Sequence, residues 1–445
     1  MNFYRTRTEA HLAQAEKLNP TLNAMTRMMP ASALAEADRA DRALAEGVSL
    51  GLLHGMTISV KDNIDTAGVN TTGGAGFLAD NIPTADAPVV KRLRQAGAVI
   101  VGKANMAELA FGSRSFSATG GQCRNPWNPG HIPGGSSGGS GVSVASDMCM
   151  GSLGTDTGGS VRLPACFNGV SGLRPTHGSV PINGVLPVSE HNDTVGPLAR
   201  SVVDVATIYA VISGYEDEDP NSIDQVIPNF LPTLHDGIKG RRIGIPRSFY
   251  FESLGPGVGE AVMAAAQVLE AAGAILVDVD VPMAAQAHSR QTDSVFADVC
   301  SVFHDRLLNA PETITANVYE RMKRGLDVTG VQYAEAMAFR IRWRREVKRL
   351  FNGIDILLSP TSPIVAPPIE DGANLFEATK AVTRNTYAGA SAGLPGLSVP
   401  CGFADGLPIG LQLEAAWFND PLLFQAGVVY QKATDFHLQR APMLD

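Results

Sequence analysis

The sequence predicts an α/β protein built on a large mixed, largely parallel β-sheet covered by helices on both faces. Short β-branched runs such as 56–60 and 241–246 alternate with helical stretches such as 259–272, a pattern typical of α/β folds. Hydrophobic residues make up 44% of the 445 positions, enough to bury a large core. No run of roughly eighteen uncharged apolar residues suggests a membrane span. Because α/β enzymes of this length often form one unit, we expect a single domain.

The elements follow in order along the chain. Residues 6–47 are rich in Ala, Glu, Leu and Arg, which predicts helices with a break at Asn19-Pro20. The expected strands are 56–60, 98–101, 241–246, 274–281, 355–358, 397–400 and 408–413, the last two joined by a turn at 404–406. The further helices expected are 87–96, 106–111, 202–213, 259–272, several within 283–351, and 421–432. The acidic, Pro- and Asn-rich residues 216–233 predict a surface loop.

Composition excludes several classes of function. A formal net charge of −9 argues against a phosphate-backbone partner, since nucleic-acid binding needs a basic face. The basic run 340–349 spaces its cations around a helix, which favours a solvated face over an anion site. The five cysteines are too scattered for a disulfide framework or a zinc site, which favours a reducing compartment. The first twenty residues carry charges throughout and have no signal-peptide core, so we expect a cytoplasmic protein.

Two Gly/Ser loops stand out. Residues 134–140 read GGSSGGS, and residues 154–162 read GTDTGGSVR. Glycine at this density is costly in conformational entropy, so it is kept where the backbone turns with positive φ or approaches another group closely. The loops therefore present backbone N–H groups with little side-chain obstruction.

A histidine-dependent hydrolase is one interpretation of the first loop. The string GSSGG matches G-x-S-x-G with Ser137 as nucleophile, and His177 or His191 with Asp193 could complete a triad. Such a nucleophile follows a strand directly, whereas the preceding residues 125–133 contain three prolines that would remove ladder donors. A nucleotide site is also disfavoured, because neither loop matches a P-loop or a dinucleotide fingerprint.

A serine–lysine pair fits better. Lys61 follows the apolar strand 56–60, where burial would disfavour its charged form and lower its pKa. A neutral lysine can act as a general base for a serine that attacks an acyl carbon. The developing oxyanion is best held by backbone N–H groups such as those of 157–160, at about 3–4 kcal/mol for a single donor.

The same residues resemble the amidase signature family. The matching strings are GGSSGG at 134–139, GTDTGGSVRLPA at 154–165, GVSGLRPT at 169–176, LHGM at 53–56, VKDN at 60–63, VGKANM at 101–106, NPW at 125–127, GLP at 393–395 and LPIGLQL at 407–413. They cover nearly the whole chain. The resemblance implies a single α/β/α domain around a large twisted mixed sheet. Within residues 1–445 we expect N-terminal helices at 1–50, the signature core at 51–215, and the rest of the sheet and pocket walls at 216–445.

The resemblance also implies a Ser–cis-Ser–Lys triad and hydrolysis of a carboxamide without metal or cofactor. It places Ser160 as nucleophile, Ser136 as the bridging serine with a cis peptide bond, and Lys61 as base. It maps the oxyanion hole to the N–H groups of Thr157, Gly158, Gly159 and Ser160. We expect Asp156, Arg162 and Asn63 to support the loops. Members usually have Lys where Arg174 stands, a change that keeps the charge.

The substrate stays open at this point, because the pocket lies outside the motif. Candidate walls are 111–122, 296–333 and 384–387, where Arg384 could bind a carboxylate. A free amidase acting on a small-molecule amide, as a monomer or a homodimer without metal, nucleic acid or membrane, is the main interpretation. The alternative is the glutaminase (A) subunit of a tRNA-dependent amidotransferase. A non-catalytic binding module is disfavoured by the three triad residues.

Overall fold

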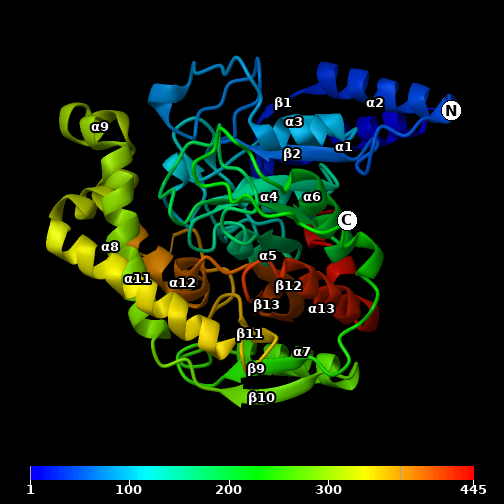
Figure 1. The fold of residues 1–445 in the computed structure, drawn as a ribbon. Coiled ribbons are helices and arrows are strands. Elements are labelled where there is room, and N and C mark those ends of the chain that lie inside the picture. Colours follow the sequence, from blue (N-terminus) through cyan, green and yellow to red (C-terminus); the bar gives the residue numbers. More distant parts are fainter. Residues whose placement is uncertain (1, 371, 445) are drawn as a thin grey trace.

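An eleven-stranded mixed sheet organises the molecule (Figure 1). The computed structural model describes residues 2–370 and 372–444. The strands are β1 Met25–Met28, β2 Thr57–Lys61, β3 Val99–Ala104, β4 Phe116–Ser117, β5 Gly121–Gln122, β6 Gly151–Asp156, β7 Ser171–Arg174, β8 Thr194–Ala199, β9 Arg242–Pro246, β10 Ile275–Val279, β11 Ile356–Pro360, β12 Gly396–Ala404 and β13 Leu407–Ala415. The order in the large sheet is β1-β3-β2-β6-β8-β7-β12-β13-β11-β9-β10, and β4 and β5 pair separately.

Helices lie on both sides of this sheet. They are α1 Phe3–Leu22, α2 Pro30–Ala45, α3 Pro88–Gln95, α4 Gly138–Ala145, α5 Arg162–Asn168, α6 Val202–Ile212, α7 Val258–Ala271, α8 Ala284–Val302, α9 His304–Asn309, α10 Ala316–Met322, α11 Gly330–Leu350, α12 Leu375–Ala392 and α13 Asp420–Ala433. Side chains of successive strand residues point to opposite faces. On β12, Gly396 accordingly lies against Arg162 of α5, and Leu397 lies against Gly427 of α13. The predicted mixed sheet with helices on both faces is confirmed.

The expectation of a largely parallel sheet is wrong. Six of the ten pairings in the large sheet are antiparallel, and four are parallel. The antiparallel pairings gather in the middle, where β6, β8, β7, β12 and β13 are neighbours. The hairpin β12–β13 turns at Asp405 and Gly406, both with positive φ, as the predicted turn requires.

Several central strands could not be recognised in the sequence because they lack an alternating pattern. β6, β7 and β8 are fully buried and rich in Gly, Ser and Thr, so neither β-branched enrichment nor polar alternation marks them. The N-terminal break is also misplaced. Pro20 lies inside the last turn of α1, which ends at Leu22 and is followed by Asn23 with a φ of 51° and then by β1.

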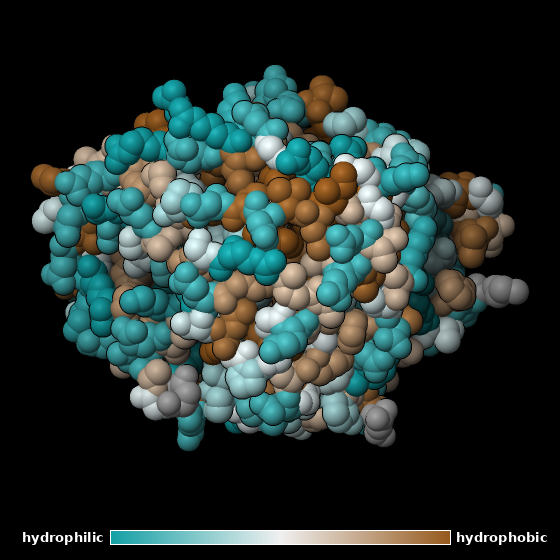
Figure 2. Space-filling model, turned by 90° about the horizontal axis from the view of Figure 1, so that it is seen from below, coloured by the Kyte–Doolittle hydropathy of each residue, from teal (hydrophilic) through white to brown (hydrophobic). Residues whose placement is uncertain are grey.

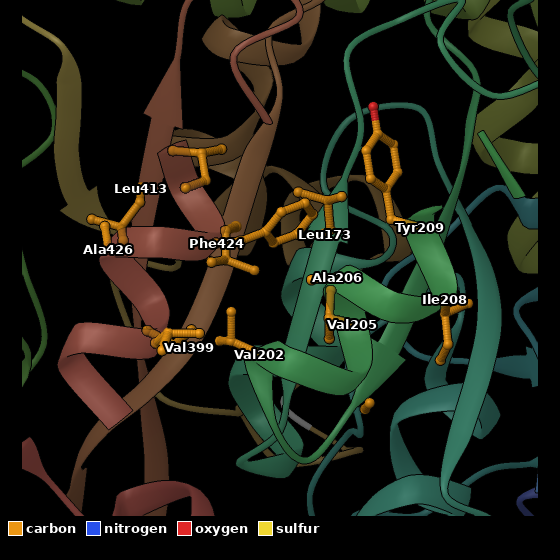
Figure 3. Close-up of a cluster of buried hydrophobic side chains, with 14 of the residues drawn as sticks. Leu173, Val202, Val205, Ala206, Ile208, Tyr209, Val399, Leu413, Phe424 and Ala426 are labelled. Atoms are coloured by element: carbon orange, nitrogen blue, oxygen red, sulfur yellow. The ribbon is translucent and has the colours of Figure 1, made fainter. Parts of the chain in front are cut away.

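The main hydrophobic core lies between the sheet and the helices α6 and α13. Figure 3 shows side chains of both helices directed toward residues of β7, β12 and β13. The residues labelled there are Leu173, Val202, Val205, Ala206, Ile208, Tyr209, Val399, Leu413, Phe424 and Ala426. This core fixes one face of the sheet and leaves the other face to α4 and α5, which carry the two Gly/Ser loops.

The helices α8, α11 and α12 pack together beside the sheet, at the left of Figure 1. The edge strand β10 lies at the bottom of that view, with Ile275 about half exposed (52%). Seen from below in Figure 2, hydrophobic residues gather in an irregular patch among hydrophilic ones.

Candidate active site

Lys61 ends β2, a strand whose five residues are all buried. Its side chain has no exposed surface, and its Nζ donates to two hydroxyl oxygens, Ser136 Oγ at 2.7 Å and Thr155 Oγ1 at 2.7 Å. The strand therefore delivers the amine directly beneath both Gly/Ser loops. The sequence did not single out Thr155, although it lies in the second loop.

Burial sets the charge of this amine. Burial away from water lowers the pKa of Lys61 to about 7. The negative charges of Asp156 and Asp193 act in the opposite direction, because they favour the charged amine. A substantial fraction of the amine is thus neutral near pH 7. Only a neutral amine can accept a proton from Ser136.

Ser136 lies in a loop held from two sides. The Gly135–Ser136 peptide bond is cis, as the resemblance implied. The Ser136 carbonyl accepts from Ala107 N at 3.0 Å, and a methyl group on Gly135 would lie 2.6 Å from Gly112 O. The loop therefore packs closely on residues 107 and 112 at this point, which only glycine at 135 allows.

Asp156 forms several hydrogen bonds with the loop that carries Ser160. Its carboxylate accepts from Gly159 N at 2.7 Å, from Val161 N at 3.1 Å and from Arg162 Nε at 3.1 Å. Burial alone would raise the pKa of Asp156, but the charges of Arg162 and Arg174 outweigh it and hold the pKa well below the usual range. A permanent carboxylate thus fixes the residues on either side of Ser160, which is itself partly exposed.

The residues predicted to form the oxyanion hole make several different hydrogen bonds. The Gly159 N–H is committed to Asp156, and the Thr157 hydroxyl donates to Asp193 at 2.5 Å. The Gly158 carbonyl accepts from Thr386 Oγ1 at 2.6 Å, so α12 is hydrogen-bonded to the loop. The N–H groups of Thr157, Gly158 and Ser160 are then the candidates for holding an oxyanion.

The residues proposed to support the loops make the following contacts. Asn63 Nδ2 donates to Thr155 Oγ1 at 3.2 Å, so it orients the hydroxyl that contacts Lys61. Arg162 reaches past Asp156 to Gln412 Oε1 at 3.0 Å. Arg174, noted only as a departure from the family pattern, donates to both the carbonyl and the carboxylate of Asp156.

The contacts of Ser137 and His177 disfavour the histidine-dependent alternative. Ser137 is fully buried, and its Oγ donates to Thr155 O at 3.1 Å. The His177 ring bonds to the Glu190 carbonyl, and burial lowers its pKa to about 4. Ser137 therefore braces the two loops against each other.

A cavity of about 200 Å³ adjoins the Ser160 loop. It is lined by His288, Ser289, Thr292, Asp293, Phe296, Arg321, Phe376, Thr379, Lys380, Thr383 and Tyr387, which come from α8, α10 and α12. Tyr387 connects it to the loop, since a methyl group on Gly158 would lie 2.1 Å from the tyrosine ring. Of the expected pocket walls, 296–333 and 384–387 contribute lining residues.

Arg321 is the buried cation of this cavity. Its guanidinium stacks 3.8 Å from the ring centre of Phe111 and 5.0 Å from that of Phe296. Burial lowers its pKa to about 10, and the Tyr387 hydroxyl interacts with it. Within the described residues it forms no ion pair, and its Nε has no hydrogen-bond partner. Nothing in the sequence distinguished this arginine from its neighbours.

Arg384, the arginine that the sequence offered for a carboxylate, is not among the residues that line the cavity. It donates to the Glu252 carbonyl and lies 5.8 Å from the Phe249 ring centre. The helical spacing explains the difference, because Lys380, Thr383 and Tyr387 share the cavity face of α12 while Arg384 lies beside that stripe.

The part of the chain that the structure describes contains no group of three or more His, Cys, Asp or Glu residues placed to hold a metal ion. Its helices include none that is both long and apolar enough to cross a membrane. All five cysteines are buried as free thiols.

Comparison with known proteins decides the family. Residues 6–424 match the model of the Amidase family. This chain belongs to the amidase signature family. Its fold and its relatives are those of amidase-type C–N hydrolases.

Proteins similar to this chain include subunits of complexes and a peptide amidase. The chain is 38% identical to the A subunit of glutamyl-tRNA(Gln) amidotransferase from Chloroflexus aurantiacus, over 97% of this chain and 94% of the relative. A solved chain described as part of an unexpected vestigial protein complex, which reveals the origins of an s-triazine catabolic enzyme, is 34% identical with a TM-score of 0.92, covering 96% and 95% of the two chains. The peptide amidase of Stenotrophomonas maltophilia is 31% identical with a TM-score of 0.86, covering 99% and 95%.

These relatives correct the expected partners. We expected a small-molecule substrate and at most a homodimer. One relative is named as one subunit of a larger enzyme, and one structural neighbour was solved as a protein complex. The expectation that a small-molecule substrate and a homodimer are the only partners is therefore not supported by these relatives.

Proposed function

We propose that this amidase hydrolyses a carboxamide to a carboxylate and ammonia or an amine through an acyl-enzyme on Ser160. The observation that carries the proposal is the 2.7 Å hydrogen bond between the buried amine of Lys61 and Ser136 Oγ. The next residue, Ser137, donates its N–H to the Ser160 carbonyl at 3.2 Å, so the bond adjoins the Ser160 loop. An amine whose pKa lies near 7 is matched to proton transfer at neutral pH.

The proposed reaction moves two protons and one acyl group. Neutral Lys61 takes the proton of Ser136, which takes the proton of Ser160 as its Oγ bonds to the amide carbon. The C–N bond then breaks, and the relay returns a proton to the departing nitrogen. Water releases the acyl group from Ser160 by the same route. The N–H groups of Thr157, Gly158 and Ser160 would hold the oxyanion in both steps.

The cavity supports a substrate that carries a carboxylate. A buried guanidinium without an ion pair is costly, and a carboxylate is the group whose geometry it matches best. Arg321 lies in the cavity that adjoins Gly158, so a small amide could place its carbonyl at Ser160 and its carboxylate at Arg321.

Glutaminase activity within a larger assembly is the specific form that the relatives favour. The similar chain of Chloroflexus aurantiacus is the A subunit of an amidotransferase, and glutamine carries a carboxylate beside its side-chain amide. A second form of the proposal is activity on carboxylated amides that lack an ammonium group. The lining of the cavity favours this form, because an ammonium group would need an unpaired carboxylate beside it. Asp293 is the carboxylate among the lining residues, and it is paired with Arg290 at 3.5 Å.

An ammonia-release screen separates these forms. Glutamine, succinamate, a urea-type amide, and neutral aliphatic and aromatic amides are offered to the wild type, Lys61→Ala, Arg321→Met and Arg384→Met. We expect Lys61→Ala to lose activity on every amide. Arg321→Met should lose about 2–5 kcal/mol of transition-state binding for carboxylated amides only, and Arg384→Met should behave as wild type. Equal losses in Arg321→Met on neutral amides would contradict the carboxylate site.

The proposed setting is the cytoplasm, which the five buried free thiols support. Cell fractionation followed by immunoblotting tests this location. Recovery of the chain in an oxidising extracytoplasmic fraction would contradict it.

A further inference from the structure

Glu414 is a buried acid that the proposed reaction does not use. It lies on β13, two residues after Gln412, and it is 1% exposed. Neither of its carboxyl oxygens has a hydrogen-bond partner among the described residues. Its carboxyl group packs so closely on α12 that a methyl group on Gly389 would lie 1.8 Å from Oε1. A buried, unbonded carboxyl group requires an electrostatic reason to be there.

The reason is the guanidinium of Arg162. One edge of this group, Nε and Nη2, donates to the two oxygens of Asp156, each at 3.1 Å. The opposite nitrogen, Nη1, donates to Gln412 Oε1 and lies 3.6 Å from Glu414 Oε1. Arg162 is therefore held from both sides, and its inner edge holds the carboxylate that fixes the Ser160 loop.

The charges of the surrounding groups point the same way. Arg162 on α5, Arg174 on β7 and Asp156 on β6 all act on Glu414, and the Tyr250 side chain after β9 lies near it. Asp193 also acts on Arg174, and Lys61 faces both Asp156 and Asp193, so Glu414 is the carboxyl group that faces the Gln412 side of Arg162. An ionised Glu414 places a negative charge beside that guanidinium, and a protonated Glu414 removes it.

We propose that Glu414 is a positioning residue for the Ser160 loop, whose carboxylate holds Arg162 in the orientation that fixes Asp156 and the backbone around the nucleophile. This inference rests on the proposed role of Ser160. It adds a residue outside the strings that resemble the family, since LPIGLQL ends at 413.

The test is the rate at which a fluorophosphonate labels Ser160, followed by intact-protein mass spectrometry across pH. Burial raises the pKa of Glu414 to about 7, opposed by Arg162 and Arg174, so the wild-type acid changes charge within the range of the experiment. At about pH 8.5 we expect Glu414→Gln to label about tenfold more slowly than wild type, the effect of losing one charged contact. At about pH 5.5 the two rates should converge, because the wild-type carboxyl group is then also neutral.

Gly389→Ala provides a second variant that keeps the acid and displaces it, and we expect it to label slowly at about pH 8.5 as well. Gly330→Ala is the matched control, because its methyl group meets nothing within 4 Å, and it should follow wild type. Thermal unfolding checks that each variant folds. If Glu414→Gln does not fold, the labelling rate of Gly389→Ala provides the test instead. A wild-type to Glu414→Gln ratio that is constant across pH, or equal rates at high pH, overturns the inference. Absence of labelling on wild-type Ser160 would instead overturn the proposed function.

Discussion

At Lys61 two hydroxyl groups replace the water that burial removes. The amine donates to Ser136 and Thr155, and it has no exposed surface. These bonds orient the amine, whereas desolvation lowers its pKa to about 7. The same residue is thus held in place by hydrogen bonds, and the absence of solvent favours its neutral form, the form that can accept a proton.

The pH dependence of activity follows from this pKa. Below about pH 7 Lys61 gains a proton and cannot accept one from Ser136, so kcat/KM should fall by about tenfold per pH unit toward acid and level off above about pH 8. The measurement is kcat/KM between about pH 5 and 9 on the best amide from the screen. A rate that is flat to about pH 5 would show that the base is another group.

Ser137 illustrates why neighbouring serines are not equivalent. Its Oγ donates to Thr155 O and accepts from Thr155 N at 3.2 Å, so it ties the two loops together. We expect Ser137→Ala to lower the free energy of unfolding by about 1–3 kcal/mol, because both Thr155 groups lose their partner. Chemical denaturation measures this loss, and Ser160 should still be labelled by a fluorophosphonate. A variant that keeps full stability but cannot be labelled would assign Ser137 to the chemistry.

At the scale of elements, the loop between β6 and α5 is organised by Asp156. Its carboxylate accepts from the backbone N–H groups of Gly159, Val161 and Arg162, and it pairs with the guanidinium groups of Arg162 and of Arg174 on β7. Because the folded-state pKa of Asp156 is depressed, its contribution to stability is present above the ordinary pKa of aspartate and is lost only in strong acid.

Asp156→Asn should therefore destabilise the protein by about 3–5 kcal/mol, since it leaves two buried guanidinium groups without their carboxylate. The loss should be the same from about pH 5 to 9 because the wild-type group stays ionised throughout. Thermal and denaturant unfolding measure it, with the exposed Asp217→Asn as control. A decrease in the free energy of unfolding of less than about 1 kcal/mol would mean that the Asp156 hydrogen bonds do not stabilise the fold.

The residues proposed to carry the chemistry were easier to predict from the sequence than the elements around them. Lys61 was recognisable because an apolar strand ending in lysine is unusual, and the loop glycines are conspicuous. β6, β7 and β8 were missed because small buried residues carry no periodic signal. Arg321 and Glu414 could not be predicted, because their roles depend on what α12 and α5 place opposite them, far away in the sequence.

For the whole molecule, the family relation changes the expected partners. Composition argued against nucleic acid and membrane but is silent on protein subunits. The relatives include a chain from a complex and a named amidotransferase subunit, each similar over more than nine-tenths of its length.

We therefore expect the chain, isolated from its native cells at low salt, to elute in an assembly larger than the 46.8 kDa monomer and to contain a different polypeptide. Size-exclusion chromatography with light scattering, followed by peptide mapping, measures this. Two further subunits would favour the amidotransferase form. Elution as a monomer or as a homodimer at native concentration would contradict the partner.

The relay from Lys61 through Ser136 to Ser160 is the claim on which the proposed function depends. Peptide mapping by mass spectrometry after fluorophosphonate treatment tests it most directly, using wild type, Ser160→Ala and Lys61→Ala. The relay predicts a single adduct on Ser160, no adduct in Ser160→Ala, and labelling slowed by about 10²–10⁴ in Lys61→Ala. An adduct on Ser137, or labelling of Lys61→Ala at the wild-type rate, would contradict it.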